Sequence, residues 1–214
     1  MSPPYLDKLS PEQQEVFKLL KRFGKKFVLA GGTAIMLQIG HRVSYDFDCF
    51  SNSLLPKNLL RRAKEVFGSS IILKIQMGDQ ITITTKSGVD VTFVYFPYRA
   101  LRKPINTDSL PLFHLDDLVA NKAYTIGRRG VWRDYIDLFS FLKRDLYSLE
   151  KIIALAEKKF EGEFNQKLFL GQLVYFRDLD IIPIEFIKEK PIPHTIKLFL
   201  EKQVEEYLRK KLPG

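Results

Sequence analysis

Two aspartates in the first quarter of the chain have the spacing of a metal site. Asp46 and Asp48 alternate with Tyr45 and Phe47, so a strand over residues 44–50 would place both carboxylates on one face, roughly 6.8 Å apart. Carboxylates held this close repel one another unless a cation lies between them, and Mg²⁺ is the usual cation, with Mn²⁺ as the alternative. The structural interpretation is that one carboxylate faces solvent and the other caps a turn.

A third acidic residue, Asp90, lies within the apolar, strongly β-forming segment 89–96. Burying an ionisable side chain in such a strand is costly unless it is paired or binds a metal. If this strand lies beside residues 44–50, three carboxylates converge, as a two-metal phosphoryl or nucleotidyl transfer requires. The alternative is that Asp90 lies on the solvent face of an edge strand.

The third chemical feature is the turn Gly31-Gly32-Thr33, which lies between an apolar segment and a short apolar helix. Two glycines let the backbone approach a ligand closely, and a helix N-terminus favours an anion. The Thr33 hydroxyl is a candidate ligand for a phosphate oxygen. The turn is not a Walker A loop, because the Lys-Ser/Thr ending is missing.

The elements that must position these residues follow from periodicity and capping signals. Ser10, Pro11 and Gln13 predict a capped helix start, and apolar residues recur at helical spacing up to Phe23. The first half is predicted to contain strands at 27–30, 44–50, 71–76, 80–86 and 89–96, and helices at 33–39 and 56–67. These elements predict an α/β first half with a mixed sheet.

The second half changes character after Pro97 and Pro104. Apolar residues recur there every three and four positions. Helices are predicted at 115–126, 132–142, 149–160, 166–176 and 194–211. We therefore expect two domains, residues 1–107 and 108–214.

Composition excludes several classes of protein. The 214 residues include 34 Lys and Arg against 25 Asp and Glu, and one cysteine, Cys49, which rules out an intramolecular disulfide or a cysteine zinc site. Residues 1–107 carry 16 basic and 8 acidic side chains, against 18 and 17 in the rest. This excess favours a polyanionic partner, although a solvated helix surface explains it equally well. Because we find neither a long apolar run nor a signal peptide, we expect a cytoplasmic protein without a membrane partner.

The motifs of both halves resemble one known family. Gly31-Gly32-Thr33-Ala34, followed by HRVSYDFDCF at residues 41–50, resembles the nucleotidyltransferase motif of the polymerase-β superfamily. More narrowly, it resembles the AbiEii/AbiGii toxins of type IV toxin–antitoxin systems, which pair a GGTA turn with an R-x-S-x-D-x-D strand. The helical half of that branch carries a lysine, an arginine and an R/K-D-x-x-D element. This chain matches those elements at Lys122, Arg128-Arg129 and Arg133-Asp134-Tyr135-Ile136-Asp137.

This resemblance implies a polymerase-β-like α/β (α+β) core followed by an all-helical domain. It implies metal binding by Asp46 and Asp48, with Asp90 as a third ligand. The implied NTP-binding residues are Gly31, Gly32, Thr33, Ser44, Lys122 and Arg133, and the implied catalytic residues are Asp46, Asp48, Asp90, Lys122 and Asp137. Each role has a structural alternative: Ser44 and Arg42 as braces of the glycine turn, Lys122 as a surface lysine, and Asp134 and Asp137 as partners in an ion pair.

The function that follows is Mg²⁺-dependent transfer of NMP from an NTP to a hydroxyl. The basic first half and the family favour an RNA acceptor, the tRNA acceptor end, and the family implies a cognate antitoxin. The alternatives are transfer to a protein hydroxyl and a non-catalytic nucleotide- or RNA-binding module. An antibiotic-modifying enzyme is a weaker alternative, because a basic half is poorly suited to a cationic aminoglycoside.

Overall fold

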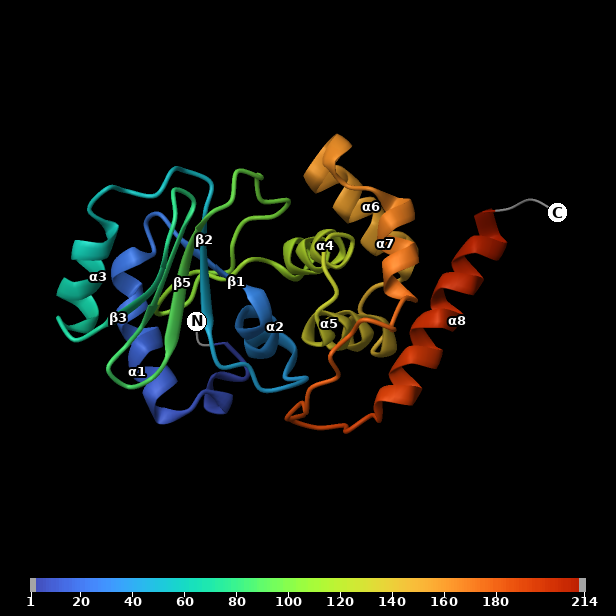
Figure 1. The fold of residues 1–214 in the computed structure, drawn as a ribbon, viewed down its shortest axis with the longest axis horizontal. Helices are drawn as coiled ribbons and strands as arrows, with labels where there is room; N and C mark the ends of the chain where they lie inside the picture. The colour runs from blue at the N-terminus through green and yellow to red at the C-terminus, as the bar shows by residue number, and fades with distance from the viewer. Residues whose placement is uncertain (1–2, 212–214) are drawn as a thin grey trace. The chain divides into compact units, whose positions relative to one another are not determined.

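The computed structural model describes residues 3–211. The chain forms two compact units, the first ending at His114 and the second beginning at Leu115, and Figure 1 traces both. The boundary therefore lies after His114 instead of after residue 107. The reason is that the intervening segment returns to the first unit, where Leu112 bridges to Leu29 and to Ile105.

A five-stranded mixed sheet forms the centre of the first unit. Its strands are β1 (Val28–Ala30), β2 (Phe47–Ser51), β3 (Ile72–Gln76), β4 (Gln80–Thr84) and β5 (Asp90–Tyr95). The spatial order is β1-β2-β5-β4-β3. Only the pairing of β2 with β5 is parallel, and it places Phe47 opposite Val91 and Asp48 opposite Thr92. The predicted mixed sheet is confirmed, and the strand that carries Asp90 does lie beside the strand that carries Asp48.

Three α-helices accompany the sheet: α1 (Pro11–Leu20), α2 (Gly31–Ile39) and α3 (Leu59–Phe67), with 3-10 turns at Leu6–Lys8 and Lys21–Phe23. Helix α1 begins with the predicted capping box, in which the Ser10 side chain accepts from the Gln13 N–H. Within this unit, α1 and α3 cover one face of the sheet and α2 lies on the other (Figure 1). The two faces therefore have different neighbours.

The face toward α1 and α3 is the hydrophobic core. Phe47, Cys49 and Phe93 are fully buried there, and the Phe93 ring lies 4.9 Å from the ring of Phe23. Burial raises the pKa of the Cys49 thiol well above its ordinary value, and the neighbouring Asp48 charge adds to this shift. Cys49 is therefore a protonated, buried core residue rather than a reactive thiol.

The second unit is helical, as predicted. It contains α4 (Leu115–Ile126), α5 (Trp132–Lys143), α6 (Leu149–Phe160), α7 (Gln166–Leu173) and α8 (Pro193–Lys211), with a 3-10 turn at Glu161–Glu163. Helix α4 packs against α5, α6 and α7. A fully buried ion pair, in which Lys159 Nζ lies 2.7 Å from Asp117 Oδ1, joins α6 to α4. Across residues 3–211, no helix is both long enough and apolar enough to cross a membrane.

Candidate active site

The glycine turn brings the start of α2 against the Asp48 carboxylate. Gly31 has a φ of +66°, a conformation that L-residues adopt only at a cost. A Cβ atom at Gly31 would lie 1.9 Å from Asp48 Oδ2, 2.9 Å from its Cγ and 3.1 Å from its Cβ. Turning the carboxylate alone would not relieve this overlap, because the whole Asp48 side chain is close. Position 31 therefore requires glycine for two independent reasons.

Gly32 is enclosed from the other side by Arg42 and Ser44. A Cβ atom at Gly32 would lie 2.5 Å from an Arg42 guanidinium nitrogen and 2.9 Å from Ser44 Oγ. Both side chains are buried, and Arg42 Nη1 donates to the Val43 carbonyl at 3.0 Å. The amide of Gln13 in α1 donates to the Ser44 carbonyl at 2.8 Å. Arg42 and Ser44 therefore pack against the turn, and the predicted contact of Ser44 with a nucleotide stays a prediction.

Thr33 is a positioning residue in this structure. It is 1% exposed, and its hydroxyl donates to the main-chain carbonyl of Asp46. In this structure the bond uses the hydroxyl hydrogen that a phosphate oxygen would need, and the contact of the Thr33 side chain with a phosphate stays a prediction. The strand predicted over 44–50 also begins later, at Phe47, and Asp46 is held just before it by Thr33.

The sheet face that carries Asp48 is polar. Asp48 lies opposite Thr92, and Thr92 lies opposite Thr82; the two threonine hydroxyls are 3.1 Å apart. Sequence reasoning assigned no role to these threonines. The signal was present, because Thr82 and Thr84 alternate with Ile81 and Ile83, as a strand with one buried and one polar face does.

Asp90 is on this polar face but is bound by other residues of the sheet. Its carboxylate oxygens lie 2.8 and 2.6 Å from Lys74 Nζ, and it accepts from the Thr84 hydroxyl at 2.6 Å. Desolvation opposes ionisation, but the hydrogen bonds from Lys74 and Thr84 and the Lys74 charge outweigh it and lower the pKa of Asp90. Among residues 3–211, no three His, Cys, Asp or Glu side chains form a group that could hold a metal ion. β5 is in the predicted place and Asp90 shares the face of Asp48, with its carboxylate paired to Lys74 in this structure; its role as a third metal ligand stays a prediction.

In the helical unit, Lys122 forms ion pairs with both acids of the Asp-x-x-Asp element. Its Nζ lies 2.6 Å from Asp134 Oδ1 and 2.6 Å from Asp137 Oδ2, and its side chain is 12% exposed. Lys122 is therefore not a surface lysine. The Asp137 side chain is 0% exposed and positions Lys122, and its predicted catalytic role stays a prediction.

Two arginines beside this cluster remain accessible. Arg133 follows the buried Trp132 on α5 and is exposed. Arg129, to which sequence reasoning gave no role, lies just before α5, and its Nε is 3.9 Å from Asp134 Oδ2. The pairing of Arg129 with Asp134 brings a second cation to the carboxylates that hold Lys122.

The first unit thus places the Asp48 side chain, and the main chain of Asp46, beside the N-terminus of a nine-residue helix. Helix N-termini favour phosphate, and Mg²⁺ binds one or two protein carboxylates together with water and substrate phosphates. Mg²⁺ that is bound by two protein carboxylates, water and substrate phosphates needs no third protein carboxylate. The arrangement fits a nucleotide bound with Mg²⁺.

We predict that Gly31→Ala disrupts the site more than an equivalent change elsewhere. The new Cβ atom must displace Asp48, whereas Gly88→Ala, at φ +82° with no heavy atom within 4 Å of the added Cβ, costs only backbone strain of ~1–2 kcal/mol. The measurements are the thermal unfolding temperature and the Mg²⁺-dependent affinity for NTP, compared between the two variants. Gly31→Ala should lose more of both. Equal losses in the two variants would show that the turn does not depend on the close approach of Asp48.

We predict that Lys74→Met lowers stability in a pH-dependent way. Because the pKa of Asp90 is lowered, its bond with Lys74 stabilises the folded chain above pH 3.8, the ordinary value. That contribution is lost as the pH falls through the lowered pKa. The urea midpoint of the variant should therefore fall below that of wild type at neutral pH and approach it in acid. The control is Lys86→Met at an exposed turn lysine, and a pH-independent difference would contradict the assignment.

We predict that Lys122→Met destabilises the helical unit by about 3–5 kcal/mol, because two buried carboxylates lose the ammonium they share. Urea denaturation followed by the fluorescence of Trp132, the single tryptophan, measures the loss. Lys158→Met, at an exposed position on α6, should change the midpoint little. If Lys122→Met is as stable as this control, the cluster does not hold the helices together.

Comparison with known proteins agrees with this geometry. Residues 18–211 match the family model described as nucleotidyl transferase AbiEii toxin, type IV TA system. The uncharacterized protein aq_aa25 of Aquifex aeolicus is 28% identical over 205 residues, which cover 94% of this chain and 98% of that protein.

Solved structures show the same fold. A nucleotidyltransferase structure from H. pylori has a TM-score of 0.57 at 18% identity, covering 96% of this chain and 100% of its own. The structure of JHP933 from Helicobacter pylori has a TM-score of 0.52 at 15% identity, and the match covers 94% of this chain and 97% of that one. The structure of the nucleotidyltransferase toxin MenT4 of Mycobacterium tuberculosis has a TM-score of 0.56 at 13% identity, and the match covers 95% of this chain and 88% of that one. Because the family model spans nearly the whole chain, the protein belongs to the AbiEii family of nucleotidyltransferase toxins of type IV toxin–antitoxin systems.

Proposed function

We propose that the protein transfers a nucleoside monophosphate from an NTP to a hydroxyl group of RNA, at the acceptor end of tRNA. The observation that carries the proposal is the contact between the glycine turn and Asp48. It places a helix N-terminus, which favours phosphate, directly beside a carboxylate of the Asp46/Asp48 pair. A nucleoside triphosphate needs the helix N-terminus for its phosphates, and its metal counterion needs the carboxylate at the same place.

The proposed cofactor is Mg²⁺, with Mn²⁺ as the alternative, held by Asp46 and Asp48. When bound, such an ion neutralises phosphate charge and favours the ionised form of an attacking hydroxyl. The backbone N–H groups at Gly31 and Gly32 orient the phosphates. The acceptor hydroxyl releases its proton to solvent and its oxygen bonds to the α-phosphorus. The bond from that phosphorus to the oxygen bridging to the β-phosphate breaks, and pyrophosphate leaves.

The remaining residues have supporting roles in this proposal. Thr33 holds the Asp46 main chain, and Arg42 and Ser44 hold the backbone of the turn. We propose that Lys122 supplies positive charge for the nucleotide phosphates, held ready by Asp134 and Asp137. Asp90 stabilises the sheet through Lys74.

The charge distribution supports RNA as the acceptor. The first half of the chain carries twice as many basic as acidic side chains, and a polyanion gains affinity from such a surface through counterion release. We also infer from the family that a cognate antitoxin protein binds this chain, and that the reaction takes place in the cytoplasm, where tRNA and NTPs are present.

The test is incubation of the purified chain with each α-³²P-labelled NTP, Mg²⁺ and total tRNA. We predict that label enters the RNA band with wild type and that Asp46→Ala and Asp48→Ala abolish this labelling without unfolding the chain. Asp79→Ala, at an exposed turn carboxylate, is the matched control and should label normally.

Each outcome has a distinct meaning. Label in a protein band would keep the chemistry and replace RNA by a protein hydroxyl. If Asp46→Ala or Asp48→Ala labels RNA as well as wild type does, the assignment of that aspartate as a metal ligand is wrong. No label in any band with any NTP would favour a nucleotide- or RNA-binding module without transferase activity.

A further inference from the structure

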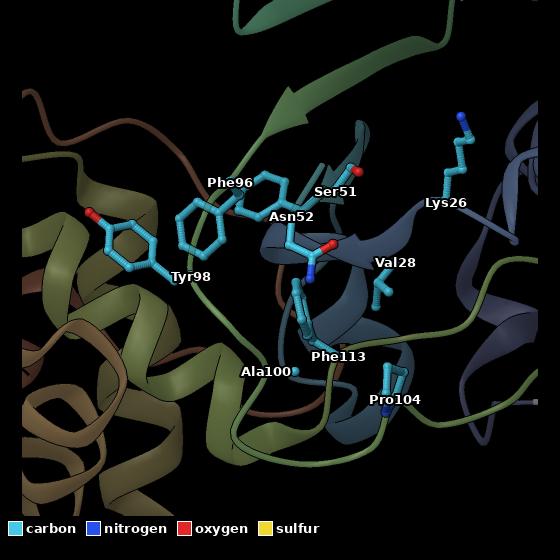
Figure 2. Close-up of a pocket in the computed structure, with 10 residues that line it drawn as sticks. Lys26, Val28, Ser51, Asn52, Phe96, Tyr98, Ala100, Pro104 and Phe113 are labelled. Carbon is cyan, nitrogen blue, oxygen red and sulfur yellow. The ribbon is translucent and has the colours of Figure 1, made fainter. Parts of the chain in front are cut away.

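A hollow lined by aromatic side chains lies in the first unit (Figure 2). Its volume is about 160 Å³, close to the ~150 Å³ cavity that accepts a benzene ring in another protein. One flat ring system therefore fits. We call this hollow the aromatic pocket; its lining residues include Lys26, Val28, Phe50, Asn52, Phe96 and Phe113.

The register of β2 fixes the position of the pocket relative to the acidic pair. Asp48 and Phe50 are alternate residues of one strand, both half-buried between the buried Phe47, Cys49 and Ser51. They therefore share a face, with their Cα atoms roughly 6.8 Å apart. On β1, Val28 lies opposite Phe50 and Ala30 lies opposite Asp48. The pocket is thus one strand repeat from the proposed reaction centre.

The aromatic rings of the pocket form a row that is not part of the hydrophobic core. The Phe50 and Phe96 ring centres are 4.7 Å apart, and those of Phe96 and Tyr98 are 4.9 Å apart. These three side chains are only half-buried, whereas Phe93 on the same sheet is fully buried. A partly exposed row of rings is a stacking platform for a planar ligand, and every nucleobase has a face that can stack on it.

Polar and basic groups surround this platform. Asn52 is exposed, and Figure 2 shows its amide directed toward Phe113. An amide of this kind offers a donor and an acceptor to the edge of a base. Lys26 at the rim is exposed. The segment 97–104, which contributes further lining residues, carries three basic and no acidic side chains. This combination is complementary to a base with an adjoining phosphate.

We propose that the aromatic pocket binds one unpaired nucleobase, stacked on Phe96 with its edge on Asn52 and its phosphate near Lys26. The proposal rests on the proposed nucleotidyl transfer, because it assigns the pocket to a substrate of that reaction. The base belongs either to the single-stranded end of the acceptor RNA or to the incoming NTP. Both sources present the same chemistry, and the experiment separates them.

The test measures the fluorescence of 2-aminopurine, which falls when this base stacks. One probe is a single-stranded RNA of about eight nucleotides with one central 2-aminopurine, and the other is 2-aminopurine ribonucleoside triphosphate with Mg²⁺. We predict that the 214-residue chain quenches at least one probe. Quenching of the RNA assigns the pocket to the acceptor strand, and quenching of the triphosphate alone assigns it to the incoming nucleotide.

Matched variants localise the signal. Phe96→Leu should weaken binding about tenfold, the size expected for loss of one stacked ring, and Phe96→Tyr, which keeps the ring, should restore it. Lys26→Ala removes an exposed side chain and should weaken binding about threefold through loss of one phosphate contact. Lys86→Ala, at the other end of β5, should bind normally.

Two results overturn the proposal: neither probe is quenched by wild type, or Phe96→Leu and Lys26→Ala both bind as tightly as wild type. The RNA titration needs no turnover, so it is independent of the transferase assay. Asp48→Asn should therefore quench the RNA probe normally while transferring no nucleotide. If the chain binds the base but labels no acceptor, the pocket assignment stands and the proposed transfer is refuted. If the chain labels an acceptor but quenches neither probe, the transfer stands and the pocket assignment is refuted.

Discussion

The close approach of the Gly31 backbone to the Asp48 carboxylate is the constraint on which the site depends. It permits no side chain at position 31 and forces a left-handed conformation there. The chain must therefore turn sharply from β1 into α2, and this turn directs the helix N-terminus toward the acidic strand. Thr33, Arg42 and Ser44 then hold the two sides of the turn in place.

Several buried or half-buried aspartates of this protein form ion pairs with lysines. Asp90 is bound to Lys74, Asp117 to Lys159, and Asp134 and Asp137 to Lys122. Each of these groups satisfies its charge within its own unit, so each contributes to the fold. Asp48 lies beside the N-terminus of α2, where a bound anion and its counterion are favoured.

The alternation of strand side chains links the acidic pair to the aromatic pocket. The same period of two that buries Phe47 and Cys49 against α1 brings Asp48 and Phe50 to the opposite face. A reaction centre and a base-sized hollow are therefore adjacent because they belong to one strand. Insertion of a single residue in β2 would send one of them into the core.

The sequence by itself determined most elements, because Ser10 and Gln13, the glycine stops and the apolar periods act over a few residues. It also identified the glycine turn and the Asp46/Asp48 pair, and the family motif connected them. Pairings across the chain were decided only by the tertiary structure. Lys74 reaches Asp90 because β3 and β5 flank β4, and the Thr33 hydroxyl reaches Asp46 because the turn folds onto β2. Local sequence cannot specify which distant cation or carbonyl meets a side chain, since that depends on strand order and register.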